Sequence, residues 1–168
     1  MFFFLLFAKT PKAAPFNDSI LSDKINATAD KVWPLLEDFC NFYKYSPFNI
    51  SFCTKGVPNR PGLVRFIAIT GPPPLGGNST VVLWEEHKLL TIDSRKRKLK
   101  YKLVDNNRLI RFYLPTFEVL RKGNGCQVRW AYRIDPVDEI TPQDIRENFT
   151  EILAYIVASA ERIFASTY

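Results

Sequence analysis

The stretch TPQDIRENFTEILAYIVASAERI, residues 141–163, decides the fold because it describes a complete amphipathic helix. Thr141 stands where a helix cap belongs, Pro142 occupies the first helical position, and Asp144 adds a negative charge to the first turn. Apolar residues then recur at intervals of three and four, which places them on one face. Such a face must pack on another apolar surface. We therefore predict a long helix from Thr141 to Thr167 that lies against the rest of the chain.

The surface that this helix needs is predicted in the central part of the chain. From Phe48 onward, apolar and polar residues alternate with a period of two, which is typical of strands that bury one face. Leu99, Tyr101 and Leu103, for example, alternate with three lysines. Candidate strands separated by turns rich in glycine, proline and asparagine cover 48–56, 62–70, 79–92, 98–105, 108–121 and 125–135.

Three shorter elements precede this meander. The pattern predicts a short strand around 20–25, a helix at 29–38, and a second short helix through Phe42 and Tyr45. A strand, two short helices, six strands and a long helix, in that order, predict an α+β fold. In this fold, a curved antiparallel sheet of about seven strands wraps around the long C-terminal helix.

Length and composition indicate one domain with a large apolar interior. The chain has 168 residues, which is near the usual size of one domain. Hydrophobic residues make up 46% of it and aromatic residues 14%, which suits a lined cavity as well as a solid core. No repeat or linker divides the chain. We expect residues 1–17 to form a flexible N-terminal arm and residues 18–168 to form the domain.

The positive charge of the chain is local. The net charge is +6, and much of the excess lies between Arg95 and Lys102. Nucleic-acid binding needs a basic face together with a recognition helix, a zinc module or an aromatic platform, and the sequence predicts none of these. We expect no nucleic-acid partner. A solvated strand edge or turn explains the basic run better than an acidic partner or a membrane surface.

The cysteines favour a cytoplasmic protein without a metal. Cys40, Cys53 and Cys126 form no CxxC pair and the chain has a single histidine, so we expect no zinc site. An odd, widely spaced set predicts reduced thiols in the cytosol. The apolar run from Phe2 to Ala8 is a poor signal peptide and too short for stable membrane insertion. Secretion stays an alternative because N-x-S/T sequons begin at Asn17, Asn26, Asn49, Asn78 and Asn148.

Four segments resemble one known superfamily. They are WPLLEDF (33–39), GLVRF (62–66), HKLLTID (87–93) and FTEIL (149–153). Together with the order of the elements, they are similar to plant START-like proteins of the polyketide cyclase and dehydrase group, and within it to lachrymatory-factor-synthase-like proteins. The resemblance implies a helix-grip fold that encloses a cavity. Its members include hormone receptors, carriers, cyclases and isomerases, so the fold alone does not select a function.

The resemblance also implies which residues line the cavity. Tyr101, Tyr113 and Trp130 stand where the synthase has two tyrosines and a tryptophan in its cavity. For the two tyrosines, the ordinary role of filling a core is an equal alternative. From the helix stripe we add Phe149, Leu153 and Ile156 as ligand-binding candidates.

Three residues are candidates for catalysis. Arg65 matches a cavity arginine of the synthase and could anchor a polar substrate head, although an internal salt bridge to Glu85 or Glu86 is the alternative. His87 stands where the synthase has its catalytic glutamate, and an imidazole can transfer protons near neutral pH, although a lone histidine is more often structural. Glu85 lies on the same side of the strand and could supply the carboxylate instead.

These residues support three functional hypotheses. The first is a cofactor-independent isomerase, cyclase or lyase of plant specialised metabolism that acts on a small apolar or amphipathic metabolite. The second is a carrier or a sensor similar to abscisic-acid receptors, with Gly71–Leu75 as a partial match to their gate and Asn107–Leu109 to their latch. The third is a defence-related protein that uses the basic run. We also predict that Gly71–Gly77 is a mobile cover over the cavity mouth.

Overall fold

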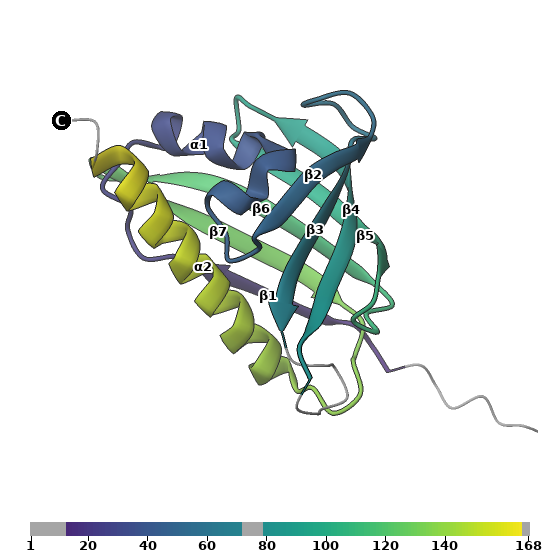
Figure 1. The fold of residues 1–168 in the computed structure, drawn as a ribbon. Coiled ribbons are helices and arrows are strands. Elements are labelled where there is room, and N and C mark those ends of the chain that lie inside the picture. Colours follow the sequence, from purple (N-terminus) through teal and green to yellow (C-terminus); the bar gives the residue numbers. More distant parts are fainter. Residues whose placement is uncertain (1–12, 72–78, 166–168) are drawn as a thin grey trace, which may run out of the picture.

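The computed structural model describes residues 13–71 and 79–165, and in these residues the chain forms one seven-stranded antiparallel sheet with helices on one side (Figure 1). In chain order, the elements are β1 (Phe16–Leu21), α1 (Ala29–Glu37), the 3₁₀ helix η1 (Phe39–Lys44), β2 (Ile50–Lys55), β3 (Val64–Gly71), β4 (Val81–Asp93), β5 (Lys98–Asn106), β6 (Tyr113–Lys122), β7 (Gly125–Ile134) and α2 (Pro142–Ala165). This arrangement confirms the predicted helix-grip fold.

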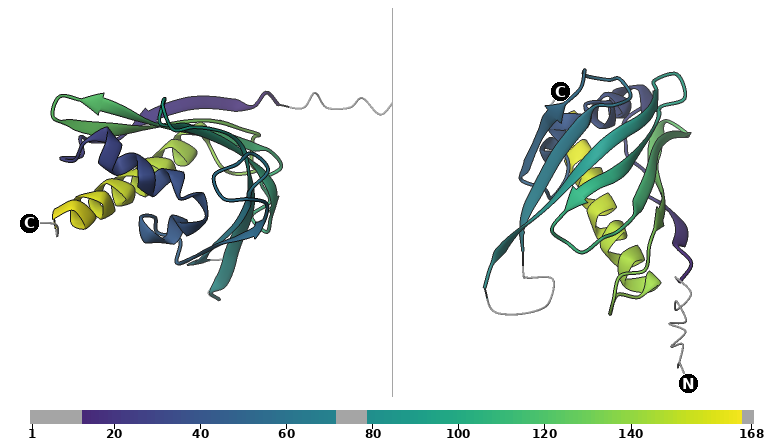
Figure 2. Two further views of the ribbon diagram at one scale, coloured as in Figure 1. Left: turned by 90° about the horizontal axis from the view of Figure 1, so that it is seen from above. Right: turned by 90° about the vertical axis from the view of Figure 1, so that its right-hand side faces the viewer.

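The sheet is a continuous meander that is extended at one edge by the first strand. The strand order is β1-β7-β6-β5-β4-β3-β2, so each strand from β2 to β7 pairs with its neighbour in sequence. β1 pairs antiparallel with β7, with Phe16 opposite Ile134. Figure 2 shows that the sheet curves around α2 and that α1 and η1 lie on the same concave side. The concave face therefore holds the apolar core.

The alternating pattern of the strands selects this concave face. In β5, Leu99 and Tyr101 are each only 2% exposed, whereas Lys98 and Lys102 on either side of this pair are exposed and Lys100 between them is partly exposed. Successive side chains of a strand point to opposite faces, so a period of two puts every apolar member on one side. The predicted inward face is confirmed.

The long helix begins as its first residues predict. The backbone N–H of Asp144 donates to Thr141 Oγ1 (3.1 Å), and the backbone N–H of Thr141 donates to Asp144 Oδ2 (2.8 Å). This reciprocal arrangement satisfies two backbone donors that an uncapped helix end would leave unpaired. The predicted end at Thr167 lies outside the described residues.

Two predicted strand boundaries were wrong. β1 begins at Phe16 and ends at Leu21, earlier than the predicted 20–25. β6 begins at Tyr113, five residues after the predicted start at 108. The reason is that β5 and β6 pair only where Lys98–Lys100 face Thr116–Glu118, and the two strands then diverge. The residues between them form a loop that borders the candidate site.

Two further expectations concern residues outside this description. Residues 1–12 make up most of the predicted arm, whose last two residues, Phe16 and Asn17, belong instead to β1, and the predicted cover at Gly71–Gly77 is described only at Gly71. Both remain predictions. In the residues that the structure describes, no helix is long and apolar enough to cross a membrane, and no group of three His, Cys, Asp or Glu side chains could hold a metal ion.

Candidate functional site

A cavity of about 440 Å³ lies between the concave face of the sheet and α2. Tyr101, Tyr113, Trp130 and Phe149 line it, as the sequence predicted. Apolar side chains make up most of the remaining wall, for example those of Phe42, Phe48, Ile67, Ile134, Ile145 and Ile152. A volume of this size can enclose a small organic molecule.

The other two helix residues that were predicted to bind ligand lie elsewhere. Leu153 and Ile156 are each 2% exposed and belong to the packed core, and neither lines the cavity. The apolar face of α2 is therefore divided between the two regions. Part of it faces the cavity through Phe149 and Ile152, and part is packed against solid core. The stripe in the sequence does not separate these two parts, because both need the same residue types.

This division predicts unequal costs of truncation along α2. We expect Ile156→Ala to lower the free energy of unfolding by about 2 to 3 kcal/mol, because it opens a void in a packed region. We expect Ile152→Ala to cost only about 1 kcal/mol, because this side chain already borders empty space and loses fewer contacts. Urea unfolding followed by circular dichroism measures both values. Equal losses would show that the cavity wall is packed as tightly as the core.

Four charged or polar side chains form a chain along one wall. Arg65 of β3 lies directly opposite His87 of β4, and Glu85 precedes His87 by two residues on the same face. His87 Nδ1 lies 3.3 Å from Arg65 Nε, and His87 Nε2 lies 2.7 Å from Glu85 Oε2. Arg108 Nη1 donates to the other carboxylate oxygen, Glu85 Oε1, at 2.7 Å. Glu85, His87 and Arg108 line the cavity.

The partners of His87 fix its tautomer. A guanidinium group only donates hydrogen bonds, so His87 Nδ1 must accept from Arg65 and the ring proton lies on Nε2, where it is donated to Glu85. Burial has the largest influence and lowers the pKa of His87; the hydrogen bond and the charge of Glu85 oppose this shift, and the charges of Arg65 and Arg108 add to it. His87 is therefore neutral near pH 7, with both nitrogen atoms already bonded.

Glu85 is ionised in the same surroundings. Burial alone raises the pKa of this carboxyl group, but the hydrogen bonds from His87 and Arg108, together with the charge of Arg108, lower the pKa to about 2. Both carboxylate oxygens have a protein partner. Glu85 is therefore a charged hydrogen-bond acceptor in the cavity wall and, in this state, a weak base.

Arg65 lies behind the cavity wall. It is 2% exposed and does not line the cavity. Its Nη1 donates to the backbone oxygen of Phe39 at 3.0 Å. Its guanidinium carbon lies 4.1 Å from the ring centre of Phe39, 4.3 Å from that of Phe42 and 4.8 Å from that of Tyr101. Arg65 thus contacts three aromatic rings and does not reach the cavity directly; of the side chains that line the cavity, it is hydrogen-bonded to His87.

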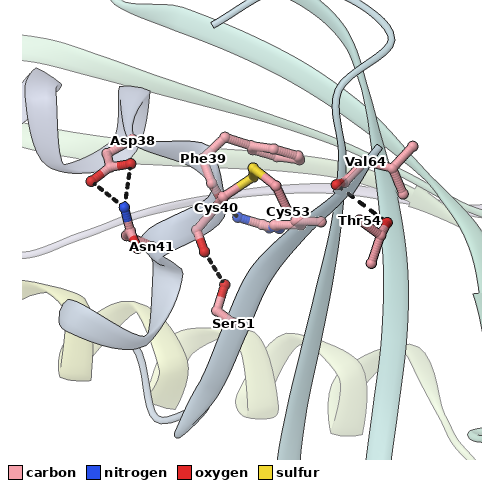
Figure 3. The surroundings of a disulfide bond; sticks show 9 residues. Asp38, Phe39, Cys40, Asn41, Ser51, Cys53, Thr54 and Val64 are labelled. Atoms are coloured by element: carbon pink, nitrogen blue, oxygen red, sulfur yellow. Dashed lines mark hydrogen bonds between the residues drawn. A yellow bond between two sulfur atoms is a disulfide. The ribbon is translucent and has the colours of Figure 1, made fainter. Parts of the chain in front are cut away.

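A disulfide holds the helix that supplies two of these rings. Cys40 of η1 is bonded to Cys53 of β2, with their Cα atoms 5.2 Å apart (Figure 3). Next to it, Ser51 Oγ donates to the backbone oxygen of Cys40 at 2.7 Å. Because Phe39 and Phe42 belong to η1, this link fixes the aromatic cage of Arg65 to the edge of the sheet.

The prediction of three reduced thiols was therefore wrong. Cys126 is the free cysteine of the described residues, and it is buried. The spacing of thirteen residues did not suggest a bond, because only the turn of the chain from η1 into β2 brings the two cysteines together. Disulfides are typical of oxidising compartments and are transient in the cytosol. The cytoplasmic location thus stays a prediction without its cysteine argument. The four sequon asparagines described, Asn17, Asn26, Asn49 and Asn148, are exposed.

Aromatic side chains form the wall that faces α2. Phe149 stacks on Trp130 with ring centres 4.5 Å apart, and Trp130 Nε1 donates to the hydroxyl of Tyr113 at 3.1 Å. Burial raises the pKa of Tyr101 to about 12 and that of Tyr113 well above its usual value. Both hydroxyl groups are therefore protonated near pH 7 and can donate a hydrogen bond, to each other or to a ligand oxygen.

Arg108 is a site residue that the sequence analysis named only within Asn107–Leu109, the partial match to a receptor latch, and not as a candidate for binding or catalysis. It was assigned to the start of a strand, whereas it lies in the loop between β5 and β6. Asn106 holds this loop, since its Oδ1 accepts from the backbone N–H of Arg108 (2.8 Å) and of Ile110 (3.1 Å). An Asn-Asn-Arg turn between two strands is the signal that could have indicated a loop there.

The comparisons with known proteins agree with this architecture. The family model described as polyketide cyclase / dehydrase and lipid transport matches residues 21–162. The chain belongs to this family. No curated protein sequence matches the chain significantly. The match to the family model confirms the START-like superfamily, whereas the closer resemblance to lachrymatory-factor-synthase-like proteins stays a prediction.

Two solved structures illustrate the shared fold. Major latex-like protein 151 from Panax ginseng is 15% identical, with a TM-score of 0.66, and the alignment covers 87% of this chain and 97% of that chain. The protein XoxI from Bacillus cereus is 19% identical, with a TM-score of 0.64 and coverage of 91% and 96%. At these identities, the similarity concerns the fold alone. Family and fold together support a ligand-binding START-like protein.

Proposed function

We propose that this member of the polyketide cyclase / dehydrase and lipid transport family binds a single small apolar or amphipathic molecule between the sheet and α2. The cavity of about 440 Å³ carries this proposal, because it combines aromatic and aliphatic walls with one short polar segment. The apolar walls supply affinity. The protonated tyrosines and the Glu85–Arg108 pair supply orientation, since a ligand that left them unsatisfied would bind less well.

Binding without turnover fits the polar segment best. A general base works well when its pKa lies near the operating pH, and the pKa of Glu85 is about 2. His87 has no unbonded nitrogen that could take a proton from a ligand. In this state, the protein is suited to act as a carrier or a sensor, as the second sequence hypothesis stated.

The second candidate is a cofactor-independent isomerase or cyclase of plant specialised metabolism. One observation favours it: a carboxylate paired with a histidine faces a largely apolar cavity that orients a substrate and excludes water. A ligand that draws Arg108 away from Glu85 would remove two of the influences that lower the pKa of this carboxyl group, so its pKa would rise while the hydrogen bond from His87 remains.

Mass spectrometry distinguishes these functions. The protein is purified from a plant extract under native conditions, the retained molecule is released and identified, and it is then incubated with the wild-type protein and with Glu85→Gln. Recovery of an unchanged molecule from both proteins supports binding alone. Conversion by the wild type that is lost in Glu85→Gln supports the enzyme.

A cavity-filling variant tests the site itself. We expect Ile152→Trp to abolish binding of the neutral fluorescent probe N-phenylnaphthylamine, because the larger side chain occupies the cavity. Tyr155→Trp, on the exposed side of the same helix, is the matched control and should bind normally. Equal binding by both variants would place the probe elsewhere and contradict the proposal.

A further inference from the structure

The charges of the hydrogen-bonded chain Arg65–His87–Glu85–Arg108, which we call the polar wall, do not balance. Arg65 and Arg108 each carry one positive charge, Glu85 carries one negative charge, and His87 is neutral. Arg65 is 2% exposed, and the partners that surround it are a neutral imidazole, a backbone oxygen and three aromatic rings. Glu85 is the one carboxylate in this chain of four residues; it pairs directly with Arg108 and is linked to Arg65 through His87. This wall of the cavity therefore carries one uncompensated positive charge.

Arg108 is the member that can offer this charge to a ligand. It lines the cavity, and one guanidinium nitrogen, Nη1, donates to Glu85. A guanidinium group has five N–H donors in a planar fork, so most of them remain available on the side away from Glu85. Its side chain is 31% exposed, whereas that of Glu85 is 6% exposed. A ligand can therefore reach Arg108 without first separating the pair.

Two other carboxylates line the cavity but do not neutralise this charge. Glu139 and Asp144 are both exposed, and the carboxylate of Asp144 is bound by Thr141 at the start of α2. Water and salt screen exposed charges strongly, whereas buried charges interact at a much lower effective dielectric constant. The buried cluster therefore dominates the field where an enclosed ligand lies.

We propose that the Arg108 end of the cavity is a subsite for an oxyanion, and that the ligand is an amphipathic anion such as a carboxylate with an apolar body. The inference rests on the proposed ligand-binding function and specifies its chemistry. The apolar body packs on Trp130, Phe149 and Ile152, and the oxyanion accepts hydrogen bonds from Arg108. Binding of the anion then completes the charge balance of the wall.

Two fluorescent dyes with the same aromatic body test this proposal. Anilinonaphthalene sulfonate carries one negative charge, and N-phenylnaphthylamine is its neutral counterpart. We expect the wild-type protein to bind the anionic dye more tightly, and the neutral dye to displace it. We expect Arg108→Gln to weaken binding of the anionic dye about tenfold and to affect binding of the neutral dye much less.

A change of opposite sign separates charge from general damage. Glu85→Gln removes the negative charge beside Arg108, so we expect it to strengthen binding of the anionic dye relative to binding of the neutral dye. Arg111→Gln, an exposed arginine in the same loop, is the matched control and should change neither dye. Near-ultraviolet circular dichroism confirms that each variant is folded before titration.

The outcomes distinguish the two proposals. The oxyanion subsite is wrong if the wild type binds the anionic dye no more tightly than the neutral dye. It is also wrong if Arg108→Gln and Glu85→Gln both weaken binding of the anionic dye. In either case, binding of the neutral dye still shows that the cavity is a ligand site. An anionic dye that the neutral dye cannot displace has bound the basic surface instead, which also contradicts the subsite. If neither dye binds, the proposed ligand-binding function fails as well.

Discussion

Arg65→Ala is expected to lower the free energy of unfolding by about 4 kcal/mol. Removing one member of a buried charged network typically costs about 3 to 5 kcal/mol. Here the substitution takes away the donor to His87 Nδ1 and to the backbone oxygen of Phe39, and leaves the buried imidazole nitrogen without this partner. It also leaves a void between the three rings that enclose the guanidinium group. Urea unfolding at pH 7 measures the loss.

Two further variants identify the cause. Arg65→Met refills part of the space between the rings, so it should recover some of the lost stability without recovering the hydrogen bonds. Arg60→Ala removes an exposed arginine that precedes β3 and should change the stability by less than about 0.5 kcal/mol. A loss at Arg65 as small as that at Arg60 would show that the network around His87 does not stabilise the fold.

At acid pH, the free energy of unfolding of the wild type is expected to fall by about 3 kcal/mol through protonation of Glu85, and Glu85→Gln is expected to abolish this fall. The pKa of this carboxyl group falls from an ordinary value of 4.5 to about 2 on folding. A lowered pKa means that the folded state favours the ionised form. The stabilisation is therefore complete above about pH 4.5 and is lost as the pH falls toward 2.

The experiment compares urea unfolding of both proteins between pH 7 and pH 2. At pH 7 the variant should be the less stable protein, and the difference should shrink steadily below pH 4.5. The pKa of His87 is also lowered, so protonation of His87 also reduces the stability of the wild type as the pH falls, but it does so at somewhat higher pH. The effect of Glu85 is therefore taken from the range below pH 4.5. Glu86→Gln, on the opposite face of β4, is the control. A constant difference over the whole range would contradict the assigned pKa.

Much of the fold could be predicted because its signals are local. The capping residues around Thr141 determine where α2 begins, and the alternation in β5 determines which side chains point inward. The wrong boundary at β6 has a non-local cause. The pattern of apolar residues begins at 108, but β5 and β6 separate beyond the pairing of Lys98–Lys100 with Thr116–Glu118. A segment forms a β-strand only where a neighbouring strand accepts and donates its backbone hydrogen bonds.

The candidate site was predicted in part for the same reason. Tyr101, Tyr113, Trp130 and Phe149 were expected at the cavity, and they line it. Arg65 was expected in the same chamber and lies behind its wall. An inward direction follows from strand parity, but the depth of a side chain depends on what packs above it. In the case of Arg65, that is the aromatic pair of η1, which the disulfide fixes in place.

The sequence by itself determined the order of the elements, the inward face of the sheet and the start of the long helix, because each depends on residues a few positions apart. Only the tertiary structure decided that Cys40 meets Cys53, that Arg65 reaches Glu85 through His87, and that Arg108 closes this chain from a loop. These contacts depend on strand register and on the paths of loops. Both are set by packing between distant segments. The same packing leaves a cavity beside one part of the apolar face of α2, although the residue types of that face would equally suit a solid core.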